Sequence, residues 1–352
     1  MSPCAANSLL ADDLPGENAA DGALVPADGG EAAARPQRPE GMTPAAASLP
    51  AGAVDAATKQ ERLRILLAFA AVWIIWGSTY LAIRIVLETL PPFLAAGGRF
   101  LTAGAVLFTF TAIRGAKLPT LAHWRSAALL GALLLLLGNG SVMFAEQRIA
   151  SGPAALLIAT EPLMIVLLQG IIPRGKLLIG LLLGFFGVAV LLGPAALLGG
   201  GALNAAACIA VIFGGTAWAA GSLLGRRLQV PENGMQAAAL QMLCGGAWLM
   251  GAAGLHGDFT GFHPAQVSTR SWLAVAYLVI FGSMIAFTAY GYLVRRVTPS
   301  RLATYAYVNP VVAVALGCLL AGEDFTPRLL LAALLIVAGV VMIIRHSAKS
   351  SA

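Results

Sequence analysis

The stretch Leu156–Leu168, LLIATEPLMIVLL, places a carboxylate and a proline at the centre of an apolar run. In a soluble protein such a run could bend at the surface and leave Glu161 in water. In a bilayer it could not, because a polar group without a partner in the hydrocarbon region costs several kcal/mol. The surroundings of Glu161 must therefore be established from the rest of the chain.

The composition excludes an ordinary soluble protein. The chain of 352 residues is 59% hydrophobic and 11% charged, whereas a soluble domain carries roughly 25% charged residues. Sixteen acidic and twenty-two basic residues are too few to cover a soluble surface of this size. The sequence shows no basic patch with interleaved aromatic residues, so we expect no nucleic-acid partner.

The chain divides into a polar tail and a series of apolar runs. Residues 1–60 are rich in Ala, Pro, Gly and Asp and lack aromatic residues, so we expect a disordered cytoplasmic N-terminal tail. From Leu63 onward, apolar runs of about the 20 residues that a bilayer requires recur to the end. We predict spans at 65–87, 92–113, 124–145, 152–172, 177–194, 203–224, 235–255, 272–294, 302–321 and 327–344, followed by a cytoplasmic C-terminal tail at 347–352.

The charges in the connections alternate between the two sides of these ten spans. Fifteen basic residues fall on one side: Lys59, Arg62, Arg64, Arg114, Lys117, Arg125, Arg174, Lys176, Arg226, Arg227, Arg295, Arg296, Arg301, Arg345 and Lys349. Three fall on the other side: Arg148, Arg270 and Arg328. Because cytoplasmic loops carry the excess of Lys and Arg, this pattern predicts a multi-pass protein with both termini in the cytoplasm.

The ten spans resemble two sets of five. An offset of about 142 residues aligns Trp76 with Trp218, Arg99 with Gln241 and Ser141 with Ser283. A slightly longer offset aligns Glu161-Pro162 with Asn309-Pro310. An odd number of spans per unit inverts the second copy, and inverted repeats in transporters place the substrate site near the midplane between the halves. We therefore predict two five-helix repeats, at 63–194 and 203–346, around a central cavity.

Two ionisable residues lie deep inside the predicted spans. Glu161 lies roughly 15 Å and Arg99 roughly 10 Å from the non-cytoplasmic side, at 1.5 Å per residue. Such residues are costly in a membrane and usually functional. These depths permit an Arg99–Glu161 ion pair, which could equally be structural. Arg84, near the end of the first span, is expected to extend to the interface.

Prolines and polar side chains suggest where the cavity lies. Pro162 removes a backbone donor and is expected to break the fourth span, and Pro310 is its counterpart in the ninth. Gly180 and Gly184, by contrast, indicate only close helix packing. The candidate cavity residues are Trp76, Ser78, Thr79, Tyr80, Arg99, Asn139, Glu161, Pro162, Trp218, Gln241, Ser283, Tyr290, Tyr305, Asn309 and Pro310.

Two longer stretches resemble a known family. WIIWGSTYLAIRIVLETLPPFLAAGGRFLTAG (Trp73–Gly104) and GNGSVMFAEQRIASGPAALLIATEPLMIVLL (Gly138–Leu168) are similar to EamA-domain exporters of the drug/metabolite transporter (DMT) superfamily. The resemblance implies an all-α integral membrane protein of ten transmembrane helices, in two inverted five-helix repeats around a central cavity. It also implies export of amino acids, other metabolites or toxic compounds, or movement of nucleotide sugars.

We therefore expect a secondary active transporter in the cell (inner or plasma) membrane that exports small metabolites or drugs by alternating access. Its expected partners are a small-molecule substrate, the lipid bilayer and a proton as candidate coupling ion. We expect no cofactor and no metal site, and a monomer or weak homodimer. A solute exchanger, a lipid-linked sugar translocator, a channel and an intramembrane enzyme remain alternatives; the enzyme lacks a recognisable catalytic base with a partner nucleophile.

Overall fold

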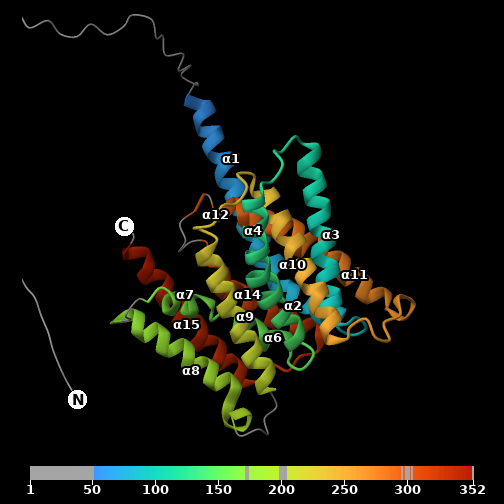
Figure 1. Ribbon diagram of the computed structural model, residues 1–352. Helices are drawn as coiled ribbons and strands as arrows, with labels where there is room; N and C mark the ends of the chain where they lie inside the picture. Colours follow the sequence, from blue (N-terminus) through green and yellow to red (C-terminus); the bar gives the residue numbers. More distant parts are fainter. Residues whose placement is uncertain are drawn as a thin grey trace, which may run out of the picture. The chain divides into compact units, whose positions relative to one another are not determined.

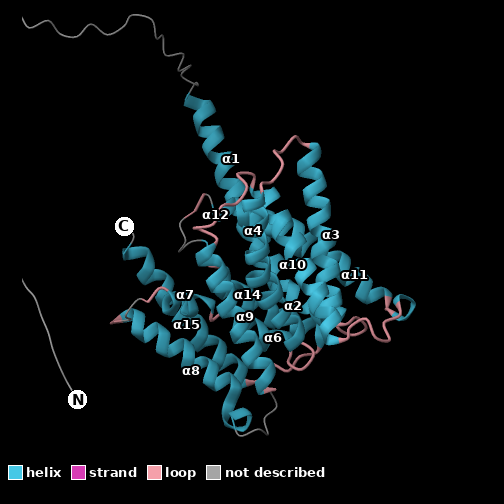
Figure 2. Ribbon diagram, in the orientation of Figure 1, coloured by secondary structure: helices cyan, strands magenta, loops and turns pink. Residues whose placement is uncertain are grey.

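The computed structural model describes residues 51–170, 174–197, 204–294, 296–297, 302 and 304–350. Within these ranges the chain is helical and contains no strand (Figure 2). The order of elements is α1 (Ala51–Ala70), η1 (Ala71–Ile75), α2 (Trp76–Val86), α3 (Pro92–Ile113), α4 (Leu121–Leu130), η2 (Gly131–Asn139), α5 (Gly140–Ala145), α6 (Ser151–Ile158), α7 (Glu161–Leu168), α8 (Lys176–Leu197), α9 (Ala205–Leu224), α10 (Gly234–His256), η3 (Pro264–Gln266), α11 (Thr269–Tyr277), η4 (Leu278–Ile285), α12 (Ala286–Val294), α14 (Tyr305–Ala321) and α15 (Pro327–Ser350) (Figure 1).

Seven helical stretches of the described chain are long and apolar enough to cross a membrane. They are Gln60–Val86, Pro92–Ile113, Leu121–Ala145, Ser151–Leu168, Ala205–Leu224, Gly234–His256 and Thr269–Leu293. Three apolar helices of 10–17 residues follow the same pattern at Lys176–Leu191, Val308–Ala321 and Pro327–Ile343. The seven long stretches coincide with seven of the ten expected spans, and the three shorter helices overlap the other three.

The helices expose large apolar side chains on their outer faces. Leu255 is 94% exposed, Ile113 is 81% exposed and Leu319 is 79% exposed. Soluble monomers rarely present extended apolar surface of this kind. The apolar exterior is what lipid chains would cover, and it supports the membrane assignment made from composition.

The predicted N-terminal tail is only partly within the described chain. Residues 1–50 lie outside it, so the disorder expected there stays a prediction. Residues 51–60 of the expected tail belong to α1, which begins at Ala51. Alanine and other strong helix formers in this segment allow the first membrane helix to continue beyond the apolar stretch. At the other terminus, α15 continues through the first four residues of the expected C-terminal tail, to Ser350.

Two prolines at equivalent positions act differently on their helices. The fourth span is broken between Ile158 and Glu161, and Pro162 lies in the first turn of α7, where its missing N–H costs nothing. This break confirms the sequence prediction. Helix α14, in contrast, continues through Pro310 without interruption. Pro310, expected to form part of the cavity and gate or a packing kink, therefore does not interrupt its helix as Pro162 does.

Three spans contain π-helical segments, in which the backbone is wider than in an α-helix. They are η1 before Trp76, η2 ending at Asn139 and η4 containing Ser283. Segments of this type are frequent at functional sites, because they reorient the side chains beside them.

Two long helix pairs frame the bundle, α3 with α10 and α8 with α15 (Figure 1). Close approach depends on glycine. A Cβ atom on Gly180 of α8 would lie 2.9 Å from the carbonyl oxygen of Gly339 on α15. The expectation that Gly180 serves helix packing is thereby confirmed. The shorter helices surround the interior of the bundle.

The turns at one end of the bundle carry four acids, three of them with buried side chains, and we call this end the acid-bearing end. It consists of the turns after α2, α5, α10 and α14, with Glu88, Glu146, Asp258 and Glu323. Asp258 accepts hydrogen bonds from the backbone N–H groups of Phe93 (2.8 Å) and Leu94 (2.9 Å) at the start of α3. A carboxylate at a helix N-terminus satisfies backbone donors and complements the helix dipole.

Candidate functional site

A cavity lies inside the bundle, between α2, α3, η2, α5, α6, α7, α9, α12 and α14. Its free volume is about 90 Å³. This holds several water molecules, but it is smaller than the roughly 300–1,000 Å³ of a drug-sized ligand site. Ten of the fifteen candidate residues line it: Trp76, Thr79, Tyr80, Arg99, Asn139, Glu161, Trp218, Tyr305, Asn309 and Pro310.

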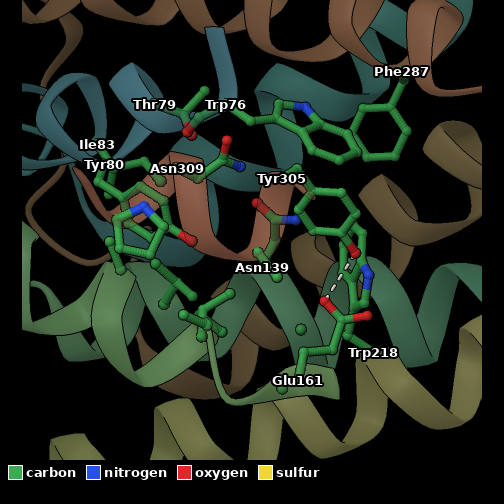
Figure 3. A pocket seen from close by; sticks show the side chains of 18 of the residues that line it. Trp76, Thr79, Tyr80, Ile83, Asn139, Glu161, Trp218, Phe287, Tyr305 and Asn309 are labelled. Atoms are coloured by element: carbon green, nitrogen blue, oxygen red, sulfur yellow. Dashed lines mark hydrogen bonds between the residues drawn. The ribbon is translucent and has the colours of Figure 1, made fainter. Parts of the chain in front are cut away.

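Glu161 reaches the cavity because the helix breaks immediately before it. Glu161 is only 4% exposed, and the Tyr305 hydroxyl donates a 3.0 Å hydrogen bond to the Glu161 Oε2 atom (Figure 3). As the first residue of α7, Glu161 also lies at the positive end of that helix's dipole. The opening stretch is therefore a broken wall of a polar cavity, with its carboxylate facing other protein groups.

Arg99 lines the same cavity from α3. It is 3% exposed, its Nε donates to Ser283 Oγ at 2.8 Å, and its guanidinium lies 4.5 Å from the centre of the Phe100 ring. The ion pair with Glu161 that the sequence permitted is not formed between these two described residues, which have different partners. The cavity thus has one basic and one acidic group in its wall, and they are not joined to each other.

Aromatic rings form one part of the wall. The Trp76 ring centre lies 5.3 Å from Phe287, 5.7 Å from Tyr305 and 6.2 Å from Trp218. The Trp76 indole N–H donates to the Gly282 carbonyl at 3.2 Å, which fixes the ring. Such a rigid aromatic surface suits the apolar part of a small ligand.

Two asparagines bring amide groups into the same space. Figure 3 shows the side chains of Asn139 and Asn309 in the region between Trp76 and Glu161. Asn309 is 7% exposed, and its Oδ1 atom has no hydrogen-bond partner among the described residues. Because buried polar atoms are nearly always satisfied, Asn309 Oδ1 offers an acceptor to a bound molecule.

The other five candidates do not line the cavity. Ser283 holds Arg99, as described above, and Pro162 follows Glu161 in α7. Ser78 bonds to the Ile75 carbonyl and the Tyr277 hydroxyl, at 2.8 and 2.6 Å. Tyr290 packs against Trp76 and Tyr305, with ring centres 5.1 and 6.0 Å away. Gln241 lies on α10 where it meets Gly131 of η2.

Sequence reasoning missed two kinds of residue. The first is apolar lining, such as Ile83, Val142 and Phe287; in the sequence these look like any lipid-facing side chain. The second is the partner of Arg84. This residue was expected to extend to the interface, and its side chain, 40% exposed, pairs with Glu323 at 2.5 Å. Its partner is distant in sequence, so only the folded chain reveals the contact.

The chain matches the model of the EamA-like transporter family twice, over residues 63–193 and 205–345. It is 43% identical to the uncharacterized inner membrane transporter YedA of Escherichia coli (strain K12), over 81% of this chain and 92% of YedA. A probable amino-acid metabolite efflux pump of the same organism is 24% identical, with 76% of this chain and 90% of the pump covered.

One solved crystal structure has the same fold. It superimposes with a TM-score of 0.57 at 23% sequence identity, and the match covers 83% of this chain and 99% of the other. At this level of identity the likeness concerns the arrangement of helices only.

Proposed function

Given that this chain belongs to the EamA-like transporter family within the DMT superfamily, we propose that it is a secondary active exporter of small zwitterionic metabolites such as amino acids. The observation that carries the proposal is the pair of buried, opposite and separately held charges, Arg99 and Glu161, in one small cavity. Arg99 binds the substrate carboxylate, Glu161 binds its ammonium group, and the aromatic wall around Trp76 receives the side chain.

The size of the cavity favours small solutes over larger ones. A free volume of about 90 Å³ suits a small amino acid and a few waters, and it disfavours a lipid-linked sugar unless the walls move far apart. The relative described as a probable amino-acid metabolite efflux pump supports the same substrate class.

The proposed architecture is ten membrane helices in two inverted repeats, with both termini in the cytoplasm. Three features support the repeat. The helix pairs α3/α10 and α8/α15 join second to seventh and fifth to tenth spans, which are equivalent positions. Trp76 and its counterpart Trp218 both line the cavity, as do Glu161 and Asn309. The third and eighth spans both contain π-helical segments, η2 and η4.

Transport then proceeds by alternating access. The two repeats move against each other around the cavity, which opens first to one side of the membrane and then to the other. The interrupted α6–α7 helix supplies the flexible part of the wall, since few backbone hydrogen bonds cross the break. The acid-bearing end faces away from the cytoplasm in this topology, because the basic loops lie on the other side.

The test is efflux from cells that express the protein. A resistance screen against amino acids and their analogues identifies a substrate, and efflux of the labelled hit is then measured in Glu161→Gln and Arg99→Gln. We expect each variant to reach the membrane and to lose at least about tenfold in efflux, because a buried charged hydrogen bond contributes roughly 1.5–3 kcal/mol. Unchanged efflux in both variants would remove these charges from substrate binding.

The alternatives separate in the same system. An exchanger would require substrate on both sides in proteoliposomes, and a channel would give single-channel currents instead of slow, saturable flux. Recovery of a chemically altered solute would indicate an enzyme.

A further inference from the structure

The acid-bearing end contains a buried carboxylate held by several donors. Glu323, in the turn between α14 and α15, has a side chain only 5% exposed. It accepts hydrogen bonds from the Ser151 backbone N–H (2.9 Å), the Ser151 hydroxyl (2.6 Å) and the Gly152 N–H (3.1 Å). Arg84 of α2 completes the set at 2.5 Å. A single carboxylate thereby joins α2, the start of α6 and the end of α14.

One glycine makes room for this carboxylate. A Cβ atom on Gly317 would lie 2.5 Å from Glu323 Oε2. The contact also sets the charge of Glu323. Burial alone would raise its pKa, but the bonds from Ser151 and Gly152 and the charge of Arg84 hold the pKa below the ordinary value.

A second carboxylate at the same end has no partner. Glu146, in the turn after α5, is 6% exposed, and neither of its oxygen atoms has a hydrogen-bond partner among the described residues. A buried ionised carboxylate without donors would cost several kcal/mol, so this environment favours the neutral form. Burial raises the pKa of Glu146 well above the ordinary value, Glu323 raises it further, and Arg84 opposes both.

Glu146 lies between the surface and the central cavity. A depression at the acid-bearing end is lined by Glu146 together with Arg84, Glu88 and Arg148. On the inner side, Tyr80 lines the central cavity one helical turn before Arg84, and it interacts electrostatically with both Glu146 and Glu161. The charged and titratable groups that face Glu146 are therefore Arg84 and Tyr80 on α2, Glu88 and Arg148 in adjacent turns, and Glu323 across the bundle.

We propose that Glu146 is the proton-binding site of this transporter, distinct from the substrate site at Glu161, and that Arg84 links its protonation to the Glu323 contact. While Arg84 is bound to Glu323, Glu146 retains its proton. When Glu323 withdraws from the start of α6, Arg84 and water reach Glu146. Glu146 then transfers its proton to water, and Arg84 neutralises the carboxylate that remains. This inference rests on the proposed transport function.

The proton on Glu146 is detected without any substrate. Dicyclohexylcarbodiimide, a hydrophobic reagent, modifies protonated buried carboxyl groups, and peptide mass spectrometry locates the product. We expect the Glu146 peptide to be labelled at about pH 7 and labelling to decline at higher pH, since the ordinary pKa of Glu is about 4.3. Glu323, ionised and fully bonded, stays unlabelled, as does position 146 in Glu146→Gln. Absence of label on Glu146 at about pH 6 overturns the proposal.

The link through Arg84 is tested with Gly317→Ala, which displaces Glu323 and frees Arg84 to approach Glu146. The pH of half-maximal labelling of Glu146 then falls by about one unit or more, as expected for a nearby opposite charge. Gly251→Ala on α10 is the matched control, because a Cβ atom there has no neighbour within 4 Å. Equal midpoints in both variants would refute the link.

Transport assays separate this inference from the proposed function. In proteoliposomes with the substrate found by the resistance screen, Glu146→Gln loses the stimulation of flux by a pH gradient, whereas counterflow, which needs no net proton movement, remains measurable. A wild-type protein that transports no solute defeats the proposed function. Wild-type transport with a gradient response that survives in Glu146→Gln, or a sodium requirement at constant pH, defeats the proton site alone.

Discussion

Replacement of Glu323 by Gln should open the acid-bearing end of the bundle. The isosteric amide retains the shape of the side chain but removes its charge. Its NH₂ group also places a hydrogen-bond donor against another donor, where a carboxylate oxygen had accepted a hydrogen bond. Four hydrogen bonds converge on the native carboxylate. Each bond to a charged group contributes about 1.5–3 kcal/mol.

The total loss is smaller than that sum. Three of the four bonds end on Oε1 and can persist to the amide oxygen, so that only the Gly152 N–H meets the new NH₂ group. The Arg84 side chain is 40% exposed, so water screens its share of the ion pair. We call the arrangement in which Glu323 joins α2, α6 and α14 closed. We expect its free energy relative to an open arrangement to become less favourable by about 2–4 kcal/mol. Because each 1.36 kcal/mol is a factor of ten, the ratio of closed to open molecules should fall roughly 30- to 900-fold.

Electron–electron distance measurements can follow this change. Spin labels on cysteines at Gln147 and Asp324, both exposed, report the separation of the two sides of the acid-bearing end in a cysteine-free background. We expect Glu323→Gln to shift the distribution to a longer distance. Glu88→Gln is the matched control: its pair with Arg270, at 3.2 Å, is exposed and contributes about 1 kcal/mol or less. Identical distributions in the two variants would refute the reasoning.

Three further changes test other parts of the structure. Tyr305→Phe removes the hydroxyl that donates to Glu161 and should raise the half-saturating substrate concentration about tenfold in efflux assays; an unchanged value would show that this bond does not position Glu161. Gly339→Ala should lower the thermal unfolding midpoint in detergent, because the added Cβ would lie 2.5 Å from a carbonyl oxygen of α8 and overpacking costs about 1–3 kcal/mol; Gly98→Ala, with no neighbour within 4 Å, should not lower it. Since the native state holds the proton of Glu146 more tightly than the unfolded chain does, wild-type stability should fall as pH rises above the ordinary pKa of Glu, and Glu146→Gln should lessen that fall in thermal scans across pH.

The central charges show how far sequence reasoning extends. Glu161 and Arg99 stand out because charged residues are rare in long apolar runs, so their burial and their place beside one cavity could be predicted. Their partners could not be. The depths of the two residues permitted an ion pair, but the rotation of each helix about its axis directs Arg99 to Ser283 and Glu161 to Tyr305.

The prolines mark the same limit. A proline after Glu161 predicted a broken helix, and the break is present. The proline after Asn309 is its counterpart, expected as a gate or a packing kink, and α14 continues through it. The loss of one backbone donor is a local property of the sequence, whereas the continuation of the helix past that point depends on packing.

The sequence by itself determined that the protein lies in a membrane, how its helices are spaced along the chain and which polar residues must be buried inside the protein. These properties depend on residue type and on the thickness of a bilayer. The tertiary structure alone decided that Arg84 meets Glu323, that Glu146 has no hydrogen-bond partner in the described part of the chain, and that Ile83, Val142 and Phe287 face a cavity instead of lipid. These contacts join residues far apart in the chain, so they cannot be predicted from local sequence. Lipid is as apolar as the protein interior, so an apolar residue is equally compatible with either, and its type does not indicate which it faces.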